Sequence, residues 1–110
     1  MFPPQKKYPK QILVNGNLWE IKFTKRLRQN GHPLDGLSDP EKRINFIKTG
    51  QDRRETFKTF WHEWLHSVEV EYDLEIPHKL ISALEDPIAD LWEENGEALF
   101  ELLLFSFGES

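Results

Sequence analysis

Residues 62–66 read His-Glu-Trp-Leu-His, an HExxH motif inside a segment whose apolar residues recur at helical spacing. On a helix, His62 and His66 lie about 40° apart and one turn displaced, so both imidazoles can reach one metal ion. Glu63 lies about 100° round the helix from His62, where its carboxylate can contact a metal-bound water. The motif therefore predicts a zinc site that hydrolyses its substrate with Glu63 as general base.

A zinc site of this kind needs a third protein ligand, and the sequence offers several. The metzincin pattern is excluded, because Glu69 and Tyr72 stand where that class has a glycine and a histidine. The candidates that remain are acidic or imidazole side chains on and after the motif helix: Glu69, His78, Glu85 and Asp86. We favour Glu85, because a carboxylate on an apolar helical stripe needs a partner. His78 is the alternative, and Glu69 is expected to support a ligand imidazole from outside the metal shell.

The element that must position the motif is a helix from about residue 53 to residue 71 or 72. Asp52 and Glu55 fit a capping box at its start. Apolar residues then follow at helical spacing: Phe57, Trp61, Trp64, Leu65 and Val68. This stripe lies beside the two histidines, which we therefore expect at the edge of the core.

The residues before this helix predict a small sheet. Residues 1–10 are expected to form an extended arm, and Asn15-Gly16 is a hairpin turn signal between apolar runs. Alternating residues over 17–24 predict a half-buried strand, and residues 43–48 predict another. Residues 25–41 are dense in turn residues and predict a long loop, a type of segment that is often functional. We expect an antiparallel sheet of about three strands.

The residues after the motif helix predict one or two further helices. Pro77 suits a helix start, Pro87 predicts a kink or break, and Asn95-Gly96 predicts an end. Residues 98–107 form a very apolar helix or tail. This segment has three possible roles: completing the core, pairing with a second copy of the chain, or covering the active-site cleft. The fold class is α+β, with one domain over residues 11–110.

Charge and composition narrow the classes of function. Residues 1–60 carry 13 Lys and Arg against 6 Asp and Glu, whereas residues 61–110 carry 1 against 13. The net charge of −5 makes nucleic-acid binding unlikely, and carboxylates around the motif favour a divalent cation and cationic peptides. The chain has no cysteine, no signal-peptide pattern and no apolar run of about 20 residues. We expect a cytoplasmic protein without a membrane span.

The motif followed by Glu85, with 18 residues between His66 and Glu85, resembles the gluzincins, the thermolysin-like zinc peptidases. Residues 59–91 are similar to very short phage and prophage proteins with a zincin-like motif, and the size resembles the minigluzincins. The resemblance implies a minimal zincin-like domain in which His62, His66 and Glu85 hold zinc. It also implies a peptide or protein substrate and cleavage of a peptide bond by a zinc-bound water.

Further roles follow from the same resemblance. Tyr72 or His78 would stabilise the oxyanion of the transition state. An extended substrate would add as a strand to a sheet edge beside the motif helix, for which residues 43–48 are the expected strand. The alternative function is a zinc-stabilised binding or regulatory protein without turnover, and the substitution Glu63→Gln separates the two.

Overall fold

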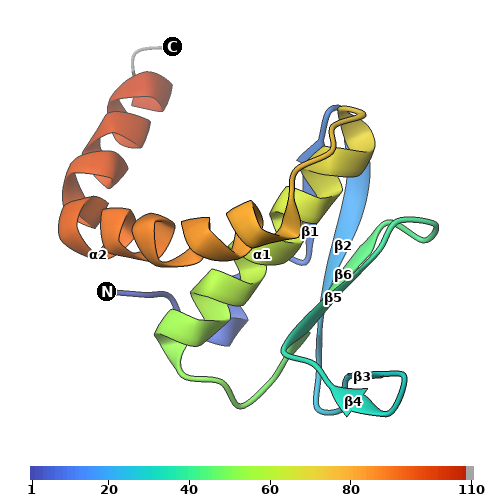
Figure 1. Cartoon of the computed structure of the whole chain (residues 1–110). Coiled ribbons are helices and arrows are strands. Elements are labelled where there is room, and N and C mark those ends of the chain that lie inside the picture. Colours follow the sequence, from blue (N-terminus) through green and yellow to red (C-terminus); the bar gives the residue numbers. More distant parts are fainter. Residues whose placement is uncertain (109–110) are drawn as a thin grey trace.

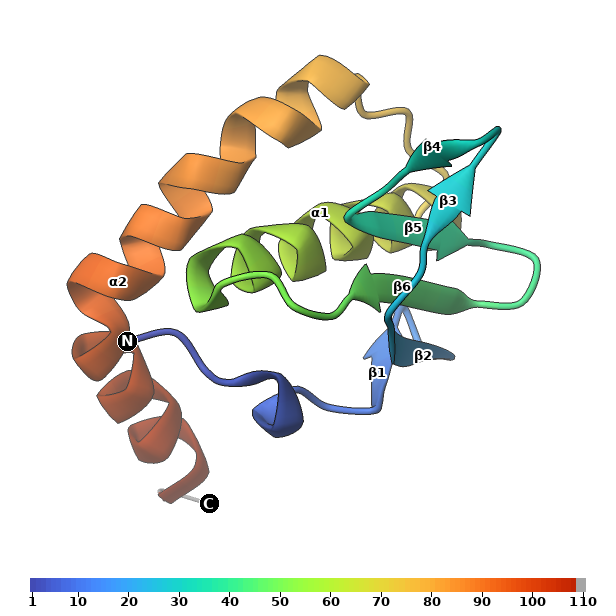
Figure 2. The ribbon, with the colours of Figure 1, turned by 90° about the horizontal axis from the view of Figure 1, so that it is seen from below.

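The computed structural model describes residues 1–108 and shows an α+β fold, as predicted (Figure 1). A sheet, the helix α1 (Arg53–Glu71) and the helix α2 (His78–Gly108) form three successive layers, with α1 in the middle (Figure 2). The strands are, in chain order, β1 (Gln11–Val14), β2 (Asn17–Thr24), β3 (Arg28–Gln29), β4 (His32–Pro33), β5 (Gly36–Asp39) and β6 (Ile44–Lys48). A short 3-10 helix, η1 (Gln5–Lys7), precedes them.

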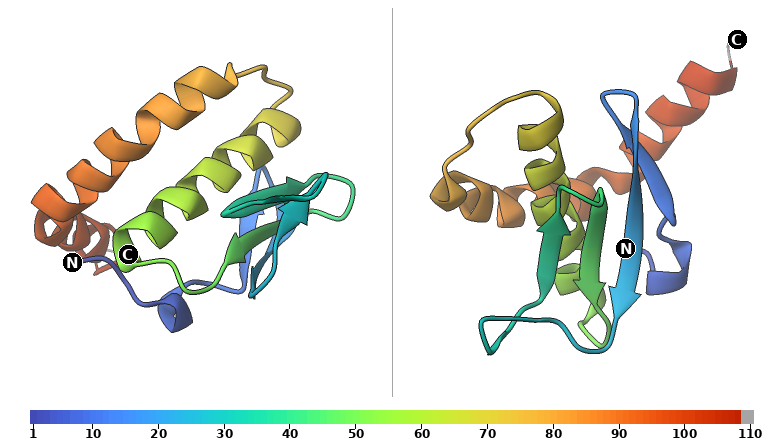
Figure 3. Two further views of the ribbon diagram at one scale, coloured as in Figure 1. Left: turned by 60° about the horizontal axis from the view of Figure 1, so that its bottom comes forward. Right: turned by 90° about the vertical axis from the view of Figure 1, so that its right-hand side faces the viewer.

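The main sheet has four strands in the order β1-β2-β6-β5 (Figure 3, right). Strand β1 pairs with β2 antiparallel and β5 pairs with β6 antiparallel, but β2 and β6 run parallel. The prediction of a purely antiparallel sheet is therefore wrong. The predicted long loop is the cause, because it contains the β3-β4 hairpin and β5 and returns the chain to β2 in the same direction.

The edge of the sheet also differs from the prediction. Strand β6, within predicted strand 43–48, lies inside the sheet between β2 and β5, so it is not the edge strand beside the motif helix. That place belongs to β5, which pairs with β6 from Gly36↔Ile47 to Asp39↔Ile44. Its four residues lie among turn formers, and such a short run gives no clear strand pattern.

Local signals in the first half predict the structure well. Asn15 and Gly16 both have positive φ, 50° and 80°, in the two-residue turn that joins β1 to β2. Trp19 and Ile21 are buried on one face of β2, while Glu20 and Lys22 are exposed on the other. The expected arm over residues 1–10 differs in part, because η1 interrupts it and Phe2 is buried against Phe57.

The helix α1 begins as predicted. The Asp52 carboxylate accepts a hydrogen bond from the backbone N–H of Glu55 at 2.8 Å, which caps the first turn. One face of α1 packs on the sheet, where the Asn45 side-chain amide of β6 donates to Ser67 Oγ at 2.8 Å in a buried contact. This contact fixes the middle of α1 over the sheet beside β5.

The helix α2 is one continuous helix, where the sequence predicted a kink or break at Pro87. It contains Pro87 and continues past Asn95 and Gly96, so the predicted end there is wrong. Figure 1 shows that α2 bends between its orange and red parts.

On the segment 98–107 the exposed apolar side chains include Phe100, Leu102, Leu104 and Phe105. These four do not complete the core of this chain, and pairing with a second copy remains a prediction. In the described part of the chain, neither helix has the length and apolar content needed to cross a bilayer.

Candidate metal centre

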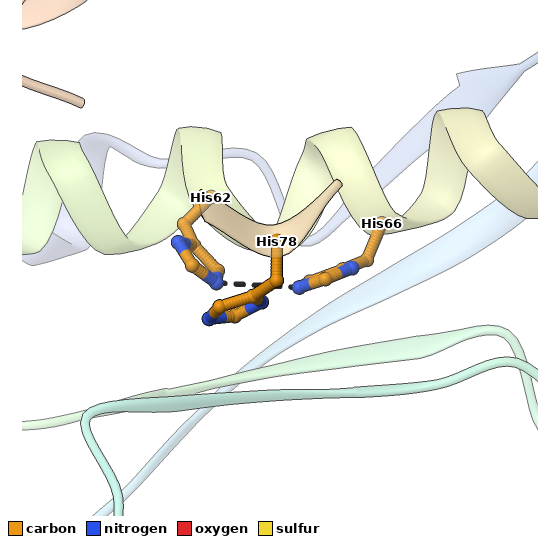
Figure 4. Close-up of side chains that lie close together, drawn as sticks. All are labelled: His62, His66 and His78. Carbon is orange, nitrogen blue, oxygen red and sulfur yellow. Dashed lines mark hydrogen bonds between the residues drawn. The ribbon is translucent and has the colours of Figure 1, made fainter. Parts of the chain in front are cut away.

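Three imidazoles converge between α1 and the start of α2 (Figure 4). His62, His66 and His78 each offer one ring nitrogen, and these nitrogens all lie within 4.8 Å of one another. The Nε2 atoms of His62 and His66 are 3.2 Å apart, and the His66 and His78 rings are stacked with centroids 5.6 Å apart. Of the two alternatives for a third ligand, the structure brings His78 to the HExxH pair.

The connection between the helices returns His78 to α1. Helix α1 ends at Glu71, and Asp73 adopts a left-handed conformation with φ 52°. The backbone N–H of Leu74 then donates to the Glu69 carbonyl at 2.8 Å, and the N–H of Ile76 donates to Glu69 Oε2 at 3.1 Å. These bonds fold the link back along the last turn of α1, so that the first residue of α2 faces the histidines.

Glu69 also holds one of the imidazoles. Its Oε1 accepts a hydrogen bond from His66 Nδ1 at 2.9 Å, as expected from the sequence for a partner outside the metal shell. Because Nδ1 carries the proton in this bond, the lone pair of His66 Nε2 is directed at His62 Nε2. A cation bound by both Nε2 atoms would accept this lone pair.

Glu85 lies on the outer side of His62 and not among the converging nitrogens. Its Oε2 is 3.6 Å from His62 Nδ1, the ring nitrogen that faces away from His66. The position matches that of Glu69 relative to His66, although the distance is longer. Asp86 points elsewhere and pairs with Lys58 at 3.0 Å and Arg54 at 3.3 Å. The structure therefore places Glu85 beside His62 and outside the group of three converging nitrogens.

Glu63 is the buried acid of the site. Its side chain lies on the sheet side of α1 under β5, and the residue is only 5% exposed. Burial, and next the charge of Glu85, raise the pKa of Glu63 to about 8. A carboxyl group with this pKa exchanges a proton near neutral pH, as a general base or acid must.

His62 is neutral near pH 7, as a metal ligand must be. Burial, followed by the neighbouring charges of His66 and His78, lowers the pKa of His62 to about 4. Burial is also the main cause that raises the pKa of Glu85. Burial thus disfavours the protonated form of His62 and the ionised forms of Glu63 and Glu85. A divalent cation bound nearby would lower the pKa of both glutamates again.

The site opens into a cavity of about 550 Å³ between β5, α1 and α2. It is lined by the three histidines, by Glu63, Glu69 and Glu85, and by residues of β5 and the segment before it, including Asp35, Gly36, Leu37 and Ser38. Tyr72, a candidate for oxyanion stabilisation, is not in the cavity lining and is 53% exposed at the end of α1. The sequence did not predict β5 as a strand of the site; the turn-rich segment 25–41 that contains it was predicted only as a long loop, of a type that is often functional.

No protein-family model matches the chain, and neither a curated protein nor a solved structure is significantly similar to it.

Proposed function

We propose that the protein is a zinc-dependent metallopeptidase that binds the ion through His62, His66 and His78. The observation that supports this most strongly is the convergence of the three ring nitrogens within 4.8 Å, beside a buried glutamate. Glu85, the ligand favoured from the sequence, takes instead the role of an outer partner of His62, because its carboxylate lies on the far ring nitrogen.

The donor set fits zinc. Three neutral imidazoles are a common set in catalytic zinc sites, where the fourth position is kept for water or substrate. The cavity beside the histidines leaves room for such a molecule. Zinc bound there would supply a water of lowered pKa and would polarise the scissile carbonyl.

The protein's own groups have separate roles in the proposed reaction. Glu63 takes a proton from the attacking water and passes it to the leaving amine. Glu69 holds the imidazole of His66 through Nδ1, which fixes the direction of the Nε2 lone pair. Glu85 lies on the corresponding side of His62, 3.6 Å from its Nδ1. His78 is assigned here as a ligand rather than as the oxyanion donor expected earlier.

The substrate is an extended peptide bound along β5. This strand is at the edge of the sheet, lines the cavity and lies over Glu63. An edge strand offers unpaired backbone groups to an added strand, which would set a peptide bond beside the metal centre. The substrate is thus proposed to pair with β5 and not, as the sequence suggested, with residues 43–48.

A structural zinc site is the second candidate, and one observation favours it. Two of the histidines are on α1 and the third is the first residue of α2. An ion held by all three ties the helices together whether or not it catalyses a reaction. Such a protein would bind a partner or regulate one without turnover.

Metal analysis and hydrolysis together test the proposal. Wild type, His78→Ala and Glu85→Ala are purified without chelator, with His32→Ala as the matched control because His32 is exposed on β4. We expect about one zinc per chain in all but His78→Ala. Glu63→Gln should then keep zinc and no longer cleave a mixed peptide library that wild type cleaves. Zinc-free wild type contradicts the proposal, and zinc without cleavage by wild type leaves the structural alternative.

A further inference from the structure

Gly36 stands apart from the glycines of the turns. Gly16, Gly31 and Gly50 have positive φ and open space where a side chain would be, so each serves the local backbone. Gly36 has no positive φ, yet a Cβ built on it would lie 2.6 Å from Glu63 Oε2 and 2.6 Å from Thr59 Cγ2. Real Cβ atoms essentially never lie so close to other atoms, so a side chain at position 36 would require Glu63 and Thr59 to shift.

The strand cannot easily move away to admit a side chain. Gly36 is paired with Ile47 of β6, and Ile47 is fully buried. The residue before the strand is also held, because the Asp35 carbonyl accepts hydrogen bonds from the Lys48 N–H at 2.8 Å and from the Gln51 side-chain amide at 3.4 Å. Gln51 is joined in turn to Thr59 Oγ1 at 3.1 Å. These contacts set the height of β5 over α1.

We propose that Gly36 is a positioning residue for Glu63. The missing side chain lets β5 pass directly over the carboxylate, and the carboxylate keeps its place in the cavity that the three histidines line. A methyl group at position 36 would displace the carboxylate from this place while leaving the histidines of α1 and α2 unchanged. This inference rests on the proposed zinc centre.

Acetohydroxamic acid is a suitable probe, because it chelates zinc and a carboxylate beside the ion can accept its proton. Its affinity is measured by calorimetry on zinc-loaded wild type, Gly36→Ala, Glu63→Gln and the double variant. Gly96→Ala is the matched control, because the nearest atom to a Cβ there is 4.0 Å away.

We expect full zinc content in Gly36→Ala and an affinity for the probe lowered roughly 10- to 100-fold, the range for losing one hydrogen bond to a charged group. The double variant should be no weaker than Glu63→Gln, since both changes remove the same contact. Unchanged probe affinity in Gly36→Ala, together with a loss in Glu63→Gln, would overturn the proposal. So would additive losses in the double variant.

Unfolding of the metal-free protein tests the packing without the ion. In a Thr59→Ser background, which removes the methyl contact and keeps the hydroxyl, the cost of Gly36→Ala is compared with and without Glu63→Ala. We expect most of the cost to disappear when Glu63 is truncated. An equal cost in both backgrounds would show that Gly36 does not make room for the carboxylate. Wild type that binds no zinc would overturn the proposed function instead, and this second measurement would still decide the role of Gly36 in placing Glu63.

Discussion

The contact between α1 and α2 has two ends that are built from different chemistry. At the aromatic end, Phe57 packs between Phe2 and Trp92, with ring centroids 5.0 and 5.6 Å away, and Trp92 donates to the Met1 carbonyl. At the histidine end, His62, His66 and His78 converge at the wall of a cavity. The first end is complete as it stands, whereas the second brings three imidazole ring nitrogens together.

The aromatic end of the helix pair stabilises the fold, and the histidine end carries the proposed function. Apolar burial at the aromatic end stabilises the fold without any ligand. Exposed ion pairs add to it, with Arg54 bonded to Asp90 at 2.9 Å and Lys58 to Asp86 at 3.0 Å. At the histidine end, His62 and His66 are partly buried and His78 is exposed, and their converging ring nitrogens form a donor set that an ion could join. The aromatic end therefore holds α2 in the orientation that presents His78.

The substitution Phe57→Ala should have the largest effect on stability. Phe57 is 6% exposed, and truncating a buried phenylalanine costs about 4 kcal/mol through lost burial and the cavity left behind. Urea unfolding measures the loss, and Phe57→Leu provides a milder variant that stays folded. Zinc affinity of the folded Phe57→Leu protein should stay within about twofold of wild type. A loss of zinc binding there would show that the two ends are not independent.

Zinc should stabilise the protein through the histidine end alone. At a free zinc concentration 100 times the dissociation constant, the free energy of unfolding should rise by about 2.7 kcal/mol. His78→Ala removes one of three ligands and should abolish most of this increase, whereas His32→Ala should keep it. Thermal unfolding with zinc and with a chelator measures the change. An equal increase in His78→Ala would contradict the assignment of the third ligand.

The metal-free protein should lose stability as pH rises from 6.5 to 8. Glu63 has a pKa of about 8 in the fold and near 4.5 when unfolded, so the folded state holds an extra proton in this window. The loss is up to about 2 kcal/mol, at 1.36 kcal/mol per pH unit. His62, whose pKa is lowered to about 4 in the fold, loses its unfolded-state proton near pH 6.5, so it acts in the opposite direction at the low end of this window and reduces the loss slightly. Urea unfolding of Glu63→Gln should show a much smaller decrease of stability with pH, and a slope like that of wild type would exclude Glu63 as its source.

Features that depend on residues a few positions apart are predicted well from the sequence. The cap at Asp52, the turn at Asn15-Gly16 and the pairing of His62 with His66 depend on residues a few positions apart. Periodicity and turn chemistry describe such local relations well, and the predicted cap and turn are confirmed.

Relations between distant segments were not predictable in the same way. Whether His78 or Glu85 joins the pair depends on the left-handed residue Asp73 and on the bond from Ile76 to Glu69, which set where α2 begins relative to α1. The parallel pairing of β2 with β6 likewise depends on a long connection rather than on either strand's own pattern. A helical spacing identifies which residues share a face, but not which face the next helix presents.

The smallest expected effect distinguishes the two outer carboxylates of the histidine end. Glu69 accepts a hydrogen bond from His66 at 2.9 Å and also holds the link before α2, whereas Glu85 is 3.6 Å from His62 and makes a weaker electrostatic contact. Loss of an outer partner typically lowers metal affinity about 10- to 100-fold. We expect Glu69→Gln to weaken zinc binding about tenfold and Glu85→Gln by less, as measured by competition with a chelating dye. A larger loss of zinc affinity in Glu85→Gln than in Glu69→Gln would mean that Glu85 moves onto the metal when zinc binds. Glu69 fixes both His66 and the approach of His78, so only the loss of a direct ligand should lower zinc affinity more than the loss of Glu69.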